Sequence, residues 1–425
     1  MTLQEFLAQH VKPYDPATDT YRREPFSKST DNANKASAIY NMHMYWTKQD
    51  PYVVREFIEH YTEPGDVVLD AFCGTGMTGV AAMLCRKRHP DGRMSKDGTA
   101  PRHAILFDLS PACVHIARNY TTPVDPRDLE RAFRALMDKV EPEVRPLYRT
   151  KCHRCGNPEA QIANTILSDV FRCPHCNRDV VFAEGGRWDR MKRGEKVERI
   201  ECECGWKFRK ADAEFVRVEP VEIRVDCDRC RAKGQAKCRP LDQEDRALYR
   251  RIEGEDIPCW YPKDVRLFGD VLRKKQLRDG FDCVHKMFSR RNLRALSVIW
   301  HYINESANLA CRDKLRFVFT AGLYKASLMC RWKVRRVDGR INEDGIGPYS
   351  VSSKVLYIPS LIAEKNAVDN IVTDFQKILK GEDSIYTAHW PANHKPINHV
   401  EIGDARRLQI PDGTVDYAYY DPPYG

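Results

Sequence analysis

Hydrophobic and polar positions follow two different periods along the first quarter of the chain. Residues 51–62 place apolar side chains at helical spacing, which predicts a helix. After a turn at 63–66, the runs 67–69 and 103–107 are short and apolar, as buried strands are. With a glycine-rich segment and a helix over 80–86 between them, these runs predict a βαβ unit and hence an α/β fold.

The pattern changes in the middle of the chain and then returns. An amphipathic helix is predicted over 126–140, and two further helices within 291–333. Residues 398–402 and 415–420 again have the pattern of strands. We therefore predict one α/β domain split by an insertion of about 290 residues.

Composition narrows the protein class. The 425 residues include 69 Lys and Arg against 60 Asp and Glu, and 42% are hydrophobic, which is ordinary for a globular protein. Uncharged apolar runs stay well short of the roughly 18 residues of a membrane span, and the N-terminus has no secretion-signal pattern. We expect a cytoplasmic protein without a membrane partner. Residues 241–340 hold 22 basic against 13 acidic residues and 151–240 hold 20 against 15, so the basic surface belongs to the middle of the chain.

The segment Asp70–Gly79 has the spacing G-x-G-x-x-G, which alone is a weak indication of a dinucleotide. A carboxylate at Asp70, beside a helix N-terminus, would repel a pyrophosphate. S-adenosylmethionine carries an ammonium and a sulfonium group and no phosphate, so it suits an acidic strand end with close backbone approach at Gly74 and Gly76. Asp108 ends the second strand, where it can accept hydrogen bonds from both ribose hydroxyls. The alternative is that the glycines serve only a tight turn.

A second chemical motif, D-P-P-Y, follows the last predicted strand. The exocyclic amine of adenine or cytosine is a poor nucleophile because its lone pair is delocalised into the ring. Asp421 and the Pro422 carbonyl can accept both amino hydrogens and localise that lone pair. Pro423 stiffens the loop, and Tyr424 offers a ring on which an extruded base can stack. The alternative is a proline turn with a buried tyrosine.

Eight of the 16 cysteines form four close pairs. Cys152 and Cys155, followed after seventeen residues by Cys173 and Cys176, match a four-thiolate zinc spacing. A second zinc is predicted at Cys202, Cys204, Cys227 and Cys230, with Cys238 as a possible substitute ligand. His153 and His175 are interpreted as bystanders. The remaining cysteines are interpreted as packing residues or inert thiols.

The motifs at Asp70–Gly79 and Asp421–Tyr424, in this order, resemble those of the amino-group methyltransferases that modify adenine N6 or cytosine N4 in DNA. With the cysteine-rich insert between them, the chain resembles the adenine-specific DNA methylases that contain a zinc ribbon. The resemblance implies a Rossmann-like methyltransferase sheet ordered 3-2-1-4-5-7-6, of which strands 1 to 4 are counted here. It also implies S-adenosylmethionine and zinc as cofactors and DNA as a partner.

The same resemblance implies roles for particular residues. The 70–79 segment would bind the methionine part of the cofactor, Asp108 the ribose and Asp404 the adenine. Tyr40–His43 with Lys48 is similar to the lead-in motif of the family beside the methionyl group. The expected cofactor-binding residues are Asp70, Phe72, Gly74, Gly76, Thr78, Asp108, Asp404, His43 and Lys48, and the expected catalytic residues are Asp421, Pro422, Pro423 and Tyr424.

The basic stretches are candidates for phosphate contacts. They comprise Arg187, Arg190, Lys192, Arg193, Lys196 and Arg199 around Trp188, then Arg273–Lys275, Arg290, Arg291 and Arg294, and Arg331–Lys333 with Arg335 and Arg336. The alternative is an ordinary solvated surface. The expected domains are a cofactor-binding part of the core at 1–125, a helical linker at 126–150, a zinc-ribbon insert at 151–240, a basic, largely helical, target-recognition segment at 241–395, and the returning core with the catalytic loop at 396–425.

The leading hypothesis is methyl transfer from S-adenosylmethionine to adenine N6 of a flipped-out DNA base. Aspartate at the head of D-P-P-Y favours adenine by resemblance. Cytosine N4 in DNA and guanine N2 in transfer RNA are alternative targets, and a zinc-dependent nucleic-acid-binding protein with an inactive methylase half is an alternative of another class. A restriction or defence-system protein is a possible partner. Since the chain stops one residue after Tyr424, we expect it to be C-terminally incomplete and inactive alone.

Overall fold

The computed structural model describes most of the chain and divides it into two compact units. Unit 1 comprises Met1–Phe133, Ala307–Ala321 and Asp374–Gly425, and unit 2 comprises Arg134–Ser306 and Gly322–Thr373. The described residues are 1–27, 35–86, 100–186, 188–192, 195–230, 238–269, 280–306, 308–332, 334–337, 340–346, 350–351, 357–389 and 398–422.

The unit boundaries differ from those expected from the sequence. Three of the four fall inside helices, namely α5 (Pro126–Val144), α11 (Leu309–Ala326) and α12 (Ala367–His389), and the fourth lies before α11, between Ser306 and Ala307. The expected boundaries after residues 125, 150, 240 and 395 coincide with none of them. Composition marks where a chain changes chemistry, whereas the bounds of a compact unit are set by packing.

Unit 1 contains a parallel sheet of four strands in the order β15-β2-β1-β16. These strands are β1 (Val67–Asp70), β2 (His103–Asp108), β15 (Asn398–Ile402) and β16 (Tyr417–Ala418). Leu69 lies opposite Ile105 on one side and Ala418 on the other. The order is 3-2-1-4 in the methyltransferase numbering, so the sheet is consistent with the expected fold. The last strand is shorter than the predicted 415–420.

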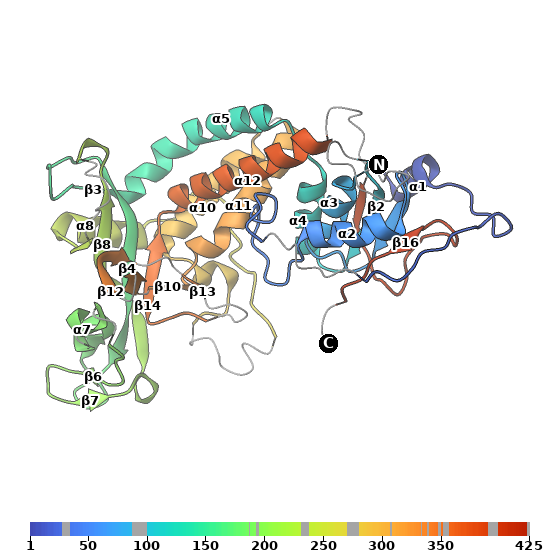
Figure 1. Cartoon of the computed structure of the whole chain (residues 1–425). Helices are drawn as coiled ribbons and strands as arrows, with labels where there is room; N and C mark the ends of the chain where they lie inside the picture. The colour runs from blue at the N-terminus through green and yellow to red at the C-terminus, as the bar shows by residue number, and fades with distance from the viewer. Residues whose placement is uncertain are drawn as a thin grey trace. The chain divides into compact units, whose positions relative to one another are not determined.

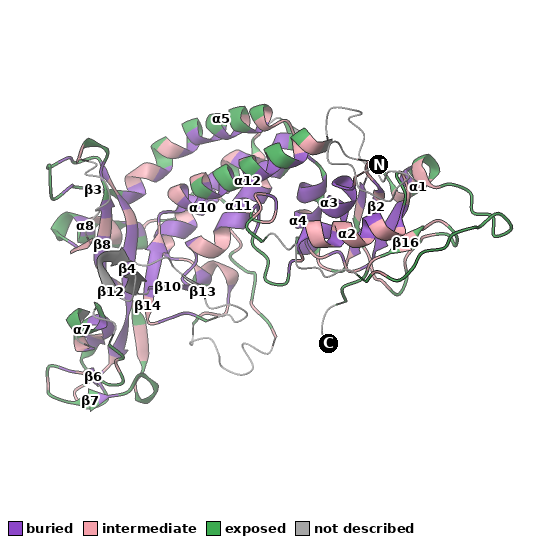
Figure 2. Cartoon of the chain, viewed as in Figure 1, coloured by how far each residue is buried: buried purple, intermediate pink, exposed green. Residues whose placement is uncertain are grey.

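Burial explains why the two central strands could be predicted from the sequence. Ala104, Ile105 and Leu106 of β2 are fully buried, and β1 is buried along its whole length (Figure 2). A strand covered on both faces is apolar at consecutive positions, whereas a half-exposed strand alternates. β15 is buried only at its first two residues, and β16 is partly exposed.

The first two helices of unit 1 begin at side-chain caps. Thr2 and Glu5 form a capping box for α1 (Leu3–His10), and Asp50 accepts a hydrogen bond from the Tyr52 backbone N–H at the start of α2 (Pro51–Tyr61). The other two helices of this part are α3 (Met77–Met83) and α4 (Pro111–Thr121). α3 starts three residues before the predicted 80–86 because the glycine turn ends at Gly76.

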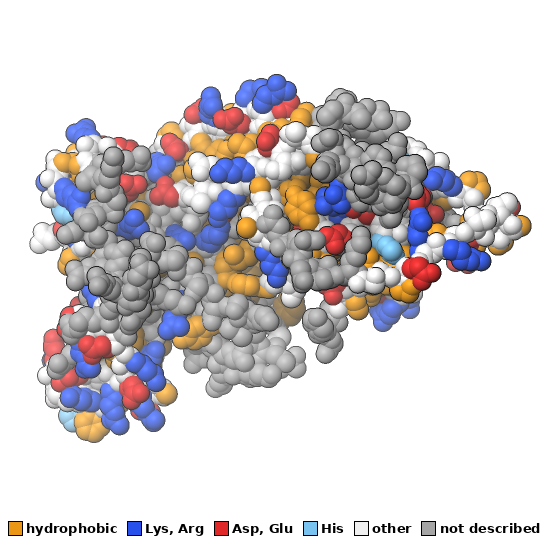
Figure 3. Space-filling view, viewed as in Figure 1, with side chains coloured by type: hydrophobic (Ala, Val, Ile, Leu, Met, Phe, Trp, Pro, Cys, Tyr) orange, Lys and Arg blue, Asp and Glu red, His pale blue; other side chains and the backbone are white. Residues whose placement is uncertain are grey.

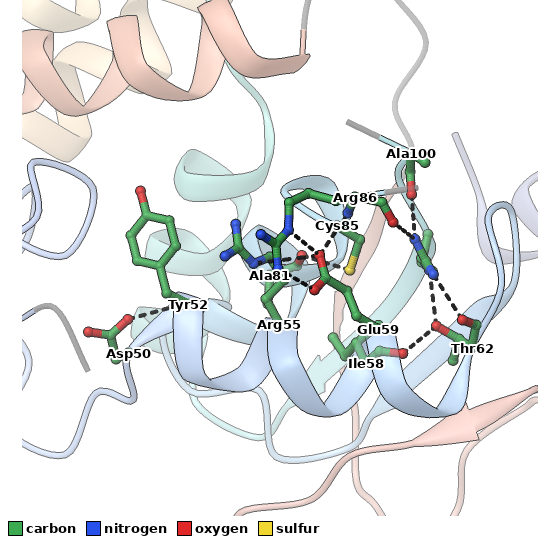
Figure 4. A network of polar contacts seen from close by, with 11 residues as sticks. Asp50, Tyr52, Arg55, Ile58, Glu59, Thr62, Ala81, Cys85, Arg86 and Ala100 are labelled. Atoms are coloured by element: carbon green, nitrogen blue, oxygen red, sulfur yellow. Dashed lines mark hydrogen bonds and ion pairs between the residues drawn. The ribbon is translucent and has the colours of Figure 1, made fainter. Parts of the chain in front are cut away.

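A buried polar network ties α2 to the segment after α3 (Figure 4). The Glu59 carboxylate accepts hydrogen bonds from the Arg86 backbone N–H at 2.8 Å and from its guanidinium at 2.9 and 3.1 Å. The buried Arg102 guanidinium donates to Thr62, which ends α2. These bonds fix α2, whose first residue follows a loop that lines the candidate site.

Unit 2 is organised around two long antiparallel strands, β4 (Ala160–Arg172) and β8 (Phe215–Asp226), which we call the β4–β8 ribbon. Figure 1 shows β6 and β7 near one end of this ribbon and β3 near the other. The ribbon belongs to an eight-stranded sheet whose main order is β13-β10-β14-β4-β8-β9, with β3 and β5 also paired to β4.

The remaining elements show that residues 241–395 contribute strands as well as the expected helices. The two helices predicted within 291–333 are α10 (Arg290–Asn304) and α11. The other described elements are β3 (Arg149–Thr150), β5 (Asp179–Val181), α6 (Phe182–Gly185), α7 (Trp188–Lys192), β6 (Ile200–Glu201), β7 (Lys207–Phe208), β9 (Cys238–Pro240), α8 (Gln243–Gly254), β10 (Cys330–Arg331), β11 (Val334–Val337), β12 (Arg340–Ile346), β13 (Ser350–Val351) and β14 (Leu361–Lys365), with short 3-10 turns at Arg145–Tyr148, Lys210–Asp212, Asp228–Cys230 and Val284–Met287. Among the described residues, every helix is too short or too polar to cross a bilayer.

Candidate functional site

A cavity of about 570 Å³ lies in unit 1 at the carboxyl ends of the parallel strands. Ligands of open α/β sheets bind at this edge, and the volume is within the range of small-molecule sites. The cavity is lined by Tyr45, Thr47, Lys48, Gln49, Val54, Asp70, Ala71, Phe72, Cys73, Gly74, Thr75, Met77, Thr78, Asp108, Leu109, Ser110, Cys113, Gly403, Asp404, Ala405, Arg406, Tyr419 and Asp421. Segments more than three hundred residues apart in the chain therefore share one cavity.

Asp70 ends β1 and is 3% exposed. Its carboxylate accepts hydrogen bonds from the Phe72 backbone N–H at 3.0 Å and from the Thr78 hydroxyl at 2.5 Å. Burial raises the pKa of Asp70 to about 6, and the charges of Asp108 and Asp421 add to that effect against the two hydrogen bonds. Asp70 is thus both a fixed element of the turn and a group that titrates near neutral pH.

The glycines of the turn serve two different purposes. Gly74 has φ +51°, and a Cβ there would meet open space, so a ligand can approach its backbone closely. Gly76 has φ +78°, and a Cβ there would lie 2.7 Å from the Cβ of Ala117. Gly74 lines the cavity, whereas Gly76 allows α3 and α4 to pack and does not appear in the lining.

Two further carboxylates follow the neighbouring strands. Asp108 accepts hydrogen bonds from the backbone N–H groups of Gly74 at 2.9 Å and Ser110 at 2.8 Å. Asp404 is paired with Arg406, whose guanidinium holds the pKa of that carboxyl at about 2. Both carboxylates line the cavity at positions where the sequence placed cofactor contacts.

The lead-in segment is only partly where it was expected. Lys48 lines the cavity, but its ammonium donates to the backbone carbonyls of Tyr40 and, at 2.7 Å, His43, and to the Tyr120 hydroxyl at 3.2 Å. Burial lowers the pKa of Lys48 to about 8. Because its ammonium is bonded to Tyr40, His43 and Tyr120, Lys48 stabilises the loop that lines the cavity.

His43, a predicted cofactor contact, does not line the cavity. Its ring is 7% exposed and packs on Phe317, with Nε2 3.2 Å from the Thr320 hydroxyl. A histidine in a loose sequence match can equally be a packing residue, and here helix α11, which the motif did not include, supplies its partners.

Asp421 follows β16, the strand next to β1, and contacts a residue that the sequence reasoning missed. The Gln49 side-chain amide donates to the Asp421 carboxylate at 2.6 Å, and the Tyr419 hydroxyl donates to the Gln49 amide oxygen at 2.7 Å. Pro422 is exposed. The predicted catalytic residues Pro423 and Tyr424 lie outside the described residues. Gln49 stands between Lys48 and a helix cap, and no motif spacing pointed to it.

The charge balance of the cavity suits a cationic ligand. Four carboxylates line it, those of Asp70, Asp108, Asp404 and Asp421. The two basic side chains of the lining, Lys48 and Arg406, are bonded to protein groups. A pyrophosphate would meet net repulsion here, whereas the ammonium and sulfonium of S-adenosylmethionine would be attracted.

The eight predicted metal ligands form two groups of four, each with its sulfur atoms within 4.8 Å of one another. The inner tetrad is Cys173, Cys176, Cys202 and Cys204, and the outer tetrad is Cys152, Cys155, Cys227 and Cys230. Neighbouring sulfurs lie 3.4 to 3.9 Å apart in the pairs Cys152–Cys230, Cys155–Cys227, Cys176–Cys202 and Cys173–Cys204. Tetrahedral zinc with bonds of about 2.3 Å requires about 3.8 Å between sulfurs, so both groups could hold a zinc ion.

The pairing of the knuckles differs from the prediction, which joined Cys152 and Cys155 to Cys173 and Cys176. Strand β4 lies between these two knuckles, and its 13 residues span about 40 Å. Because β8 runs back antiparallel, Cys227 and Cys230 return to the start of β4. The tetrads are therefore nested, and Cys238 belongs to neither.

The surroundings of Cys227, in the outer tetrad, favour a thiolate. The Asn157 side-chain amide donates to the Cys227 sulfur at 3.4 Å and holds the pKa of that thiol at about 6. A donor beside a ligand sulfur is the arrangement that orients metal ligands.

Several basic residues that were candidates for phosphate contacts are bonded within the protein. Arg291 is 3% exposed and forms an ion pair with the buried Glu364, Arg294 pairs with Glu255, and Arg290 donates to the Glu255 carbonyl at 2.5 Å. Arginines at helical spacing look alike in sequence whether they face solvent or a buried acid. The burial of Arg291 speaks against a phosphate contact at that residue.

Three residues of the basic stretch at 187–199, which lies between Cys176 and Cys202 of the inner tetrad, are paired as well. Arg190 pairs with Glu195, Lys192 with Glu222, and Lys196 with Glu198. Figure 3 shows basic and acidic side chains interspersed over the end of the ribbon that carries α7, β6 and β7. Arg187, Arg193, Arg273–Lys275 and Lys333, and the side chains of Trp188, Arg335 and Arg336, lie outside the described residues.

Comparison with known proteins gives one result. Residues 8–119 match a DNA methylase family model. This methylase segment is about a quarter of the chain and carries the lead-in loop, β1, the glycine turn, β2 and nearly all of α4. The match supports the prediction of an amino-group DNA methyltransferase fold and of S-adenosylmethionine as its cofactor. The searches of curated proteins and of solved structures found no match.

Proposed function

We propose that the protein transfers a methyl group from S-adenosylmethionine to the N6 amine of a flipped-out adenine in DNA. The observation that supports this most is the shared cavity, whose lining includes both the turn from Asp70 to Thr78 and the residue Asp421. The first is the cofactor motif and the second the head of D-P-P-Y, and transfer requires that both ligands meet.

The residues of the cavity fit the cofactor. Open space over Gly74 admits a ligand against the backbone, and Asp70 offers negative charge to a cationic group. Asp108 and Asp404 would accept hydrogen bonds from the ribose and the adenine, Asp404 after release of one of its bonds to Arg406. When bound, S-adenosylmethionine supplies an electrophilic methyl carbon on a sulfonium.

The base side of the chemistry falls to Asp421 and the Pro422 carbonyl. By accepting the two amino hydrogens they localise the nitrogen lone pair, which then attacks the methyl carbon in line. A C–N bond forms as the C–S bond breaks, the sulfur leaves with the bonding pair as a neutral thioether, and the amine loses one proton to Asp421 or water. A general base within hydrogen-bond reach of the amine is the geometry that such a step needs.

Adenine is proposed ahead of cytosine because aspartate heads the tetrapeptide. The same geometry would serve cytosine N4, whose amine has the same delocalised lone pair. Guanine N2 of transfer RNA is an RNA alternative, and a DNA-binding protein with an inactive methylase half is an alternative without catalysis.

We further propose that each tetrad binds one zinc ion in a structural role. Four thiolates leave no open coordination position, so the metal would stabilise the fold and take no part in the reaction. Each ion would join the two strands of the β4–β8 ribbon near one of its ends.

The test uses the natural full-length protein with S-adenosylmethionine labelled at the methyl group, offered DNA or transfer RNA. Label in N6-methyladenine supports the proposal. Label in N4-methylcytosine, or in RNA alone, overturns adenine as the target in favour of the corresponding alternative. Failure to bind the cofactor at millimolar concentration overturns the proposed methyl transfer itself. Asp421→Ala should abolish labelling and retain cofactor binding. The matched control is Asp412→Ala, an exposed aspartate outside the cavity lining.

A further inference from the structure

We propose that Gln49 is a positioning residue for Asp421, holding the carboxylate in the orientation that accepts an amino hydrogen of the target base. The proposal rests on the proposed methyl transfer and adds a residue that no motif contains. Gln49 and Asp421 are separated by 372 residues in the chain and joined by a hydrogen bond of 2.6 Å.

The orientation of the Gln49 amide follows from its two partners. An ionised carboxylate can only accept hydrogen bonds, so the NH₂ end of the amide must face Asp421. The amide oxygen then faces the Tyr419 hydroxyl, which donates to it at 2.7 Å. Both ends of the side chain are occupied, and a rotated amide would place its oxygen against a carboxylate.

The backbone around Gln49 is held on both sides. The preceding residue, Lys48, is fixed through its ammonium to two backbone carbonyls and the Tyr120 hydroxyl. The following residue, Asp50, caps α2 through the Tyr52 backbone N–H (Figure 4). α2 is in turn fixed by the bonds between Glu59 and Arg86. Gln49 is therefore a rigid donor rather than a mobile surface side chain.

Asp421 needs such a donor because its own surroundings do not fix it. It is exposed and follows a strand of only two residues, Tyr417–Ala418. An exposed carboxylate samples several rotamers, and ordering it costs free energy at the moment of reaction. The bond from Gln49 occupies Oδ2 and leaves Oδ1 to accept the amino hydrogen of a base. Fixing the acceptor beforehand lowers the barrier of a step that depends on alignment.

Three variants of the full-length protein test the proposal. Gln49→Ala should lower kcat by about tenfold to a hundredfold, with the Kd for S-adenosylmethionine changed less than about twofold because the cofactor residues are untouched. Tyr419→Phe should give a smaller loss, and in the Gln49→Ala background almost none, since both act through one contact. Gln409→Ala, an exposed glutamine outside this cavity, is the matched control.

Gln49→Glu supplies a readout that a merely structural role would not move. The variant has the same shape, but ionised it repels Asp421 and protonated it donates as glutamine does. Its kcat relative to the unsubstituted protein should therefore rise as the pH is lowered through the pKa of the new carboxyl. The cofactor Kd and the thermal midpoint of each variant show that it is folded.

The outcomes separate the two proposals. If the unsubstituted protein methylates and Gln49→Ala and Gln49→Glu keep its kcat at all pH values, the role of Gln49 is overturned and the proposed function stands. If the unsubstituted protein transfers no methyl group to any nucleic acid, the proposed function fails and the role of Gln49 fails with it.

Discussion

The Thr78 hydroxyl donates a hydrogen bond of 2.5 Å to the Asp70 carboxylate, across the glycine turn. This bond joins the end of β1 to the first turn of α3. Burial raises the pKa of Asp70 to about 6, and the bond from Thr78 opposes this effect without cancelling it. Asp70 therefore changes charge between pH 5 and pH 7. That range is accessible to a folded enzyme, so the charge of the candidate cofactor site can be titrated directly.

We expect the affinity for S-adenosylmethionine to increase by about tenfold between pH 5 and pH 7, with a midpoint near 6. The reason is that the cationic ligand favours the ionised carboxylate, and the ionised fraction of a group with this pKa rises about tenfold over that range. Asp404, with a pKa of about 2, stays ionised and does not contribute. Isothermal titration calorimetry at several pH values measures the effect.

Two variants check that Asp70 is the titrating group. Asp70→Asn should bind the cofactor weakly and without this pH dependence. Thr78→Val removes a bond that lowers the pKa of Asp70, so it should move the midpoint of the binding curve upward.

The same pKa affects the stability of the protein. Because the pKa of Asp70 is higher in the folded than in the unfolded state, ionisation of Asp70 lowers the free energy of unfolding as the pH rises from about 4 to about 6. Above about pH 6 this loss is complete.

Metal analysis should find two zinc ions per chain, and paired substitutions should reveal which cysteines share an ion. Cys173→Ser with Cys202→Ser should remove one ion, because both belong to the inner tetrad. Cys152→Ser with Cys173→Ser should remove two, because these belong to different tetrads. The opposite stoichiometries would restore the pairing that the linear spacing predicted.

The ion pair between Arg291 and Glu364 should be structural. Arg291→Met leaves a buried carboxylate without its partner and should lower the free energy of unfolding by about 3–5 kcal/mol. DNA affinity, corrected for the folded fraction, should not change. Calorimetric unfolding and DNA titration measure the two quantities, and a selective loss of DNA binding with unchanged stability would speak for a phosphate contact.

Gly76→Ala should destabilise the protein by about 2–4 kcal/mol, because its Cβ would overlap Ala117 and its φ of +78° is left-handed. The matched control is Gly254→Ala in α8, where a Cβ meets open space and φ is not positive. Alanine there should be neutral or slightly stabilising. Denaturant unfolding of both variants checks the pair.

The parallel sheet could be predicted from the sequence because its centre is buried. Val67–Asp70 and His103–Asp108 are apolar at consecutive positions, and each ends in an acid at the edge where the cavity lies. The third and fourth strands also lie where the sequence predicted strands, although β15 is buried only at its first two residues and β16 is partly exposed and shorter than predicted. The antiparallel sheet of unit 2 was not predicted, because β14 joins it by pairing with β4 of the cysteine-rich region, far away in the chain.

Site residues could be predicted where they belong to a short sequence motif. They could not be predicted where their role depends on a contact with a residue far away in the chain. Asp70, Gly74, Asp108 and Asp421 line one cavity as their motifs indicated. Gln49 has an ordinary sequence context, and its two bonds reach residues 370 and 372 positions later. The zinc knuckles were recognisable one by one, but their partners depend on the direction in which β8 returns.

The nesting of the tetrads has a consequence for synthesis. All four inner cysteines are synthesised, and leave the ribosome, before Cys227 and Cys230 do, so the inner loop can close on its metal while the outer one is still open. Assembly would then proceed from the tip of the ribbon toward its base, each closure shortening the loop that the next must bridge. Released fragments that contain the inner tetrad and end between Cys204 and Cys227 should bind a single zinc ion.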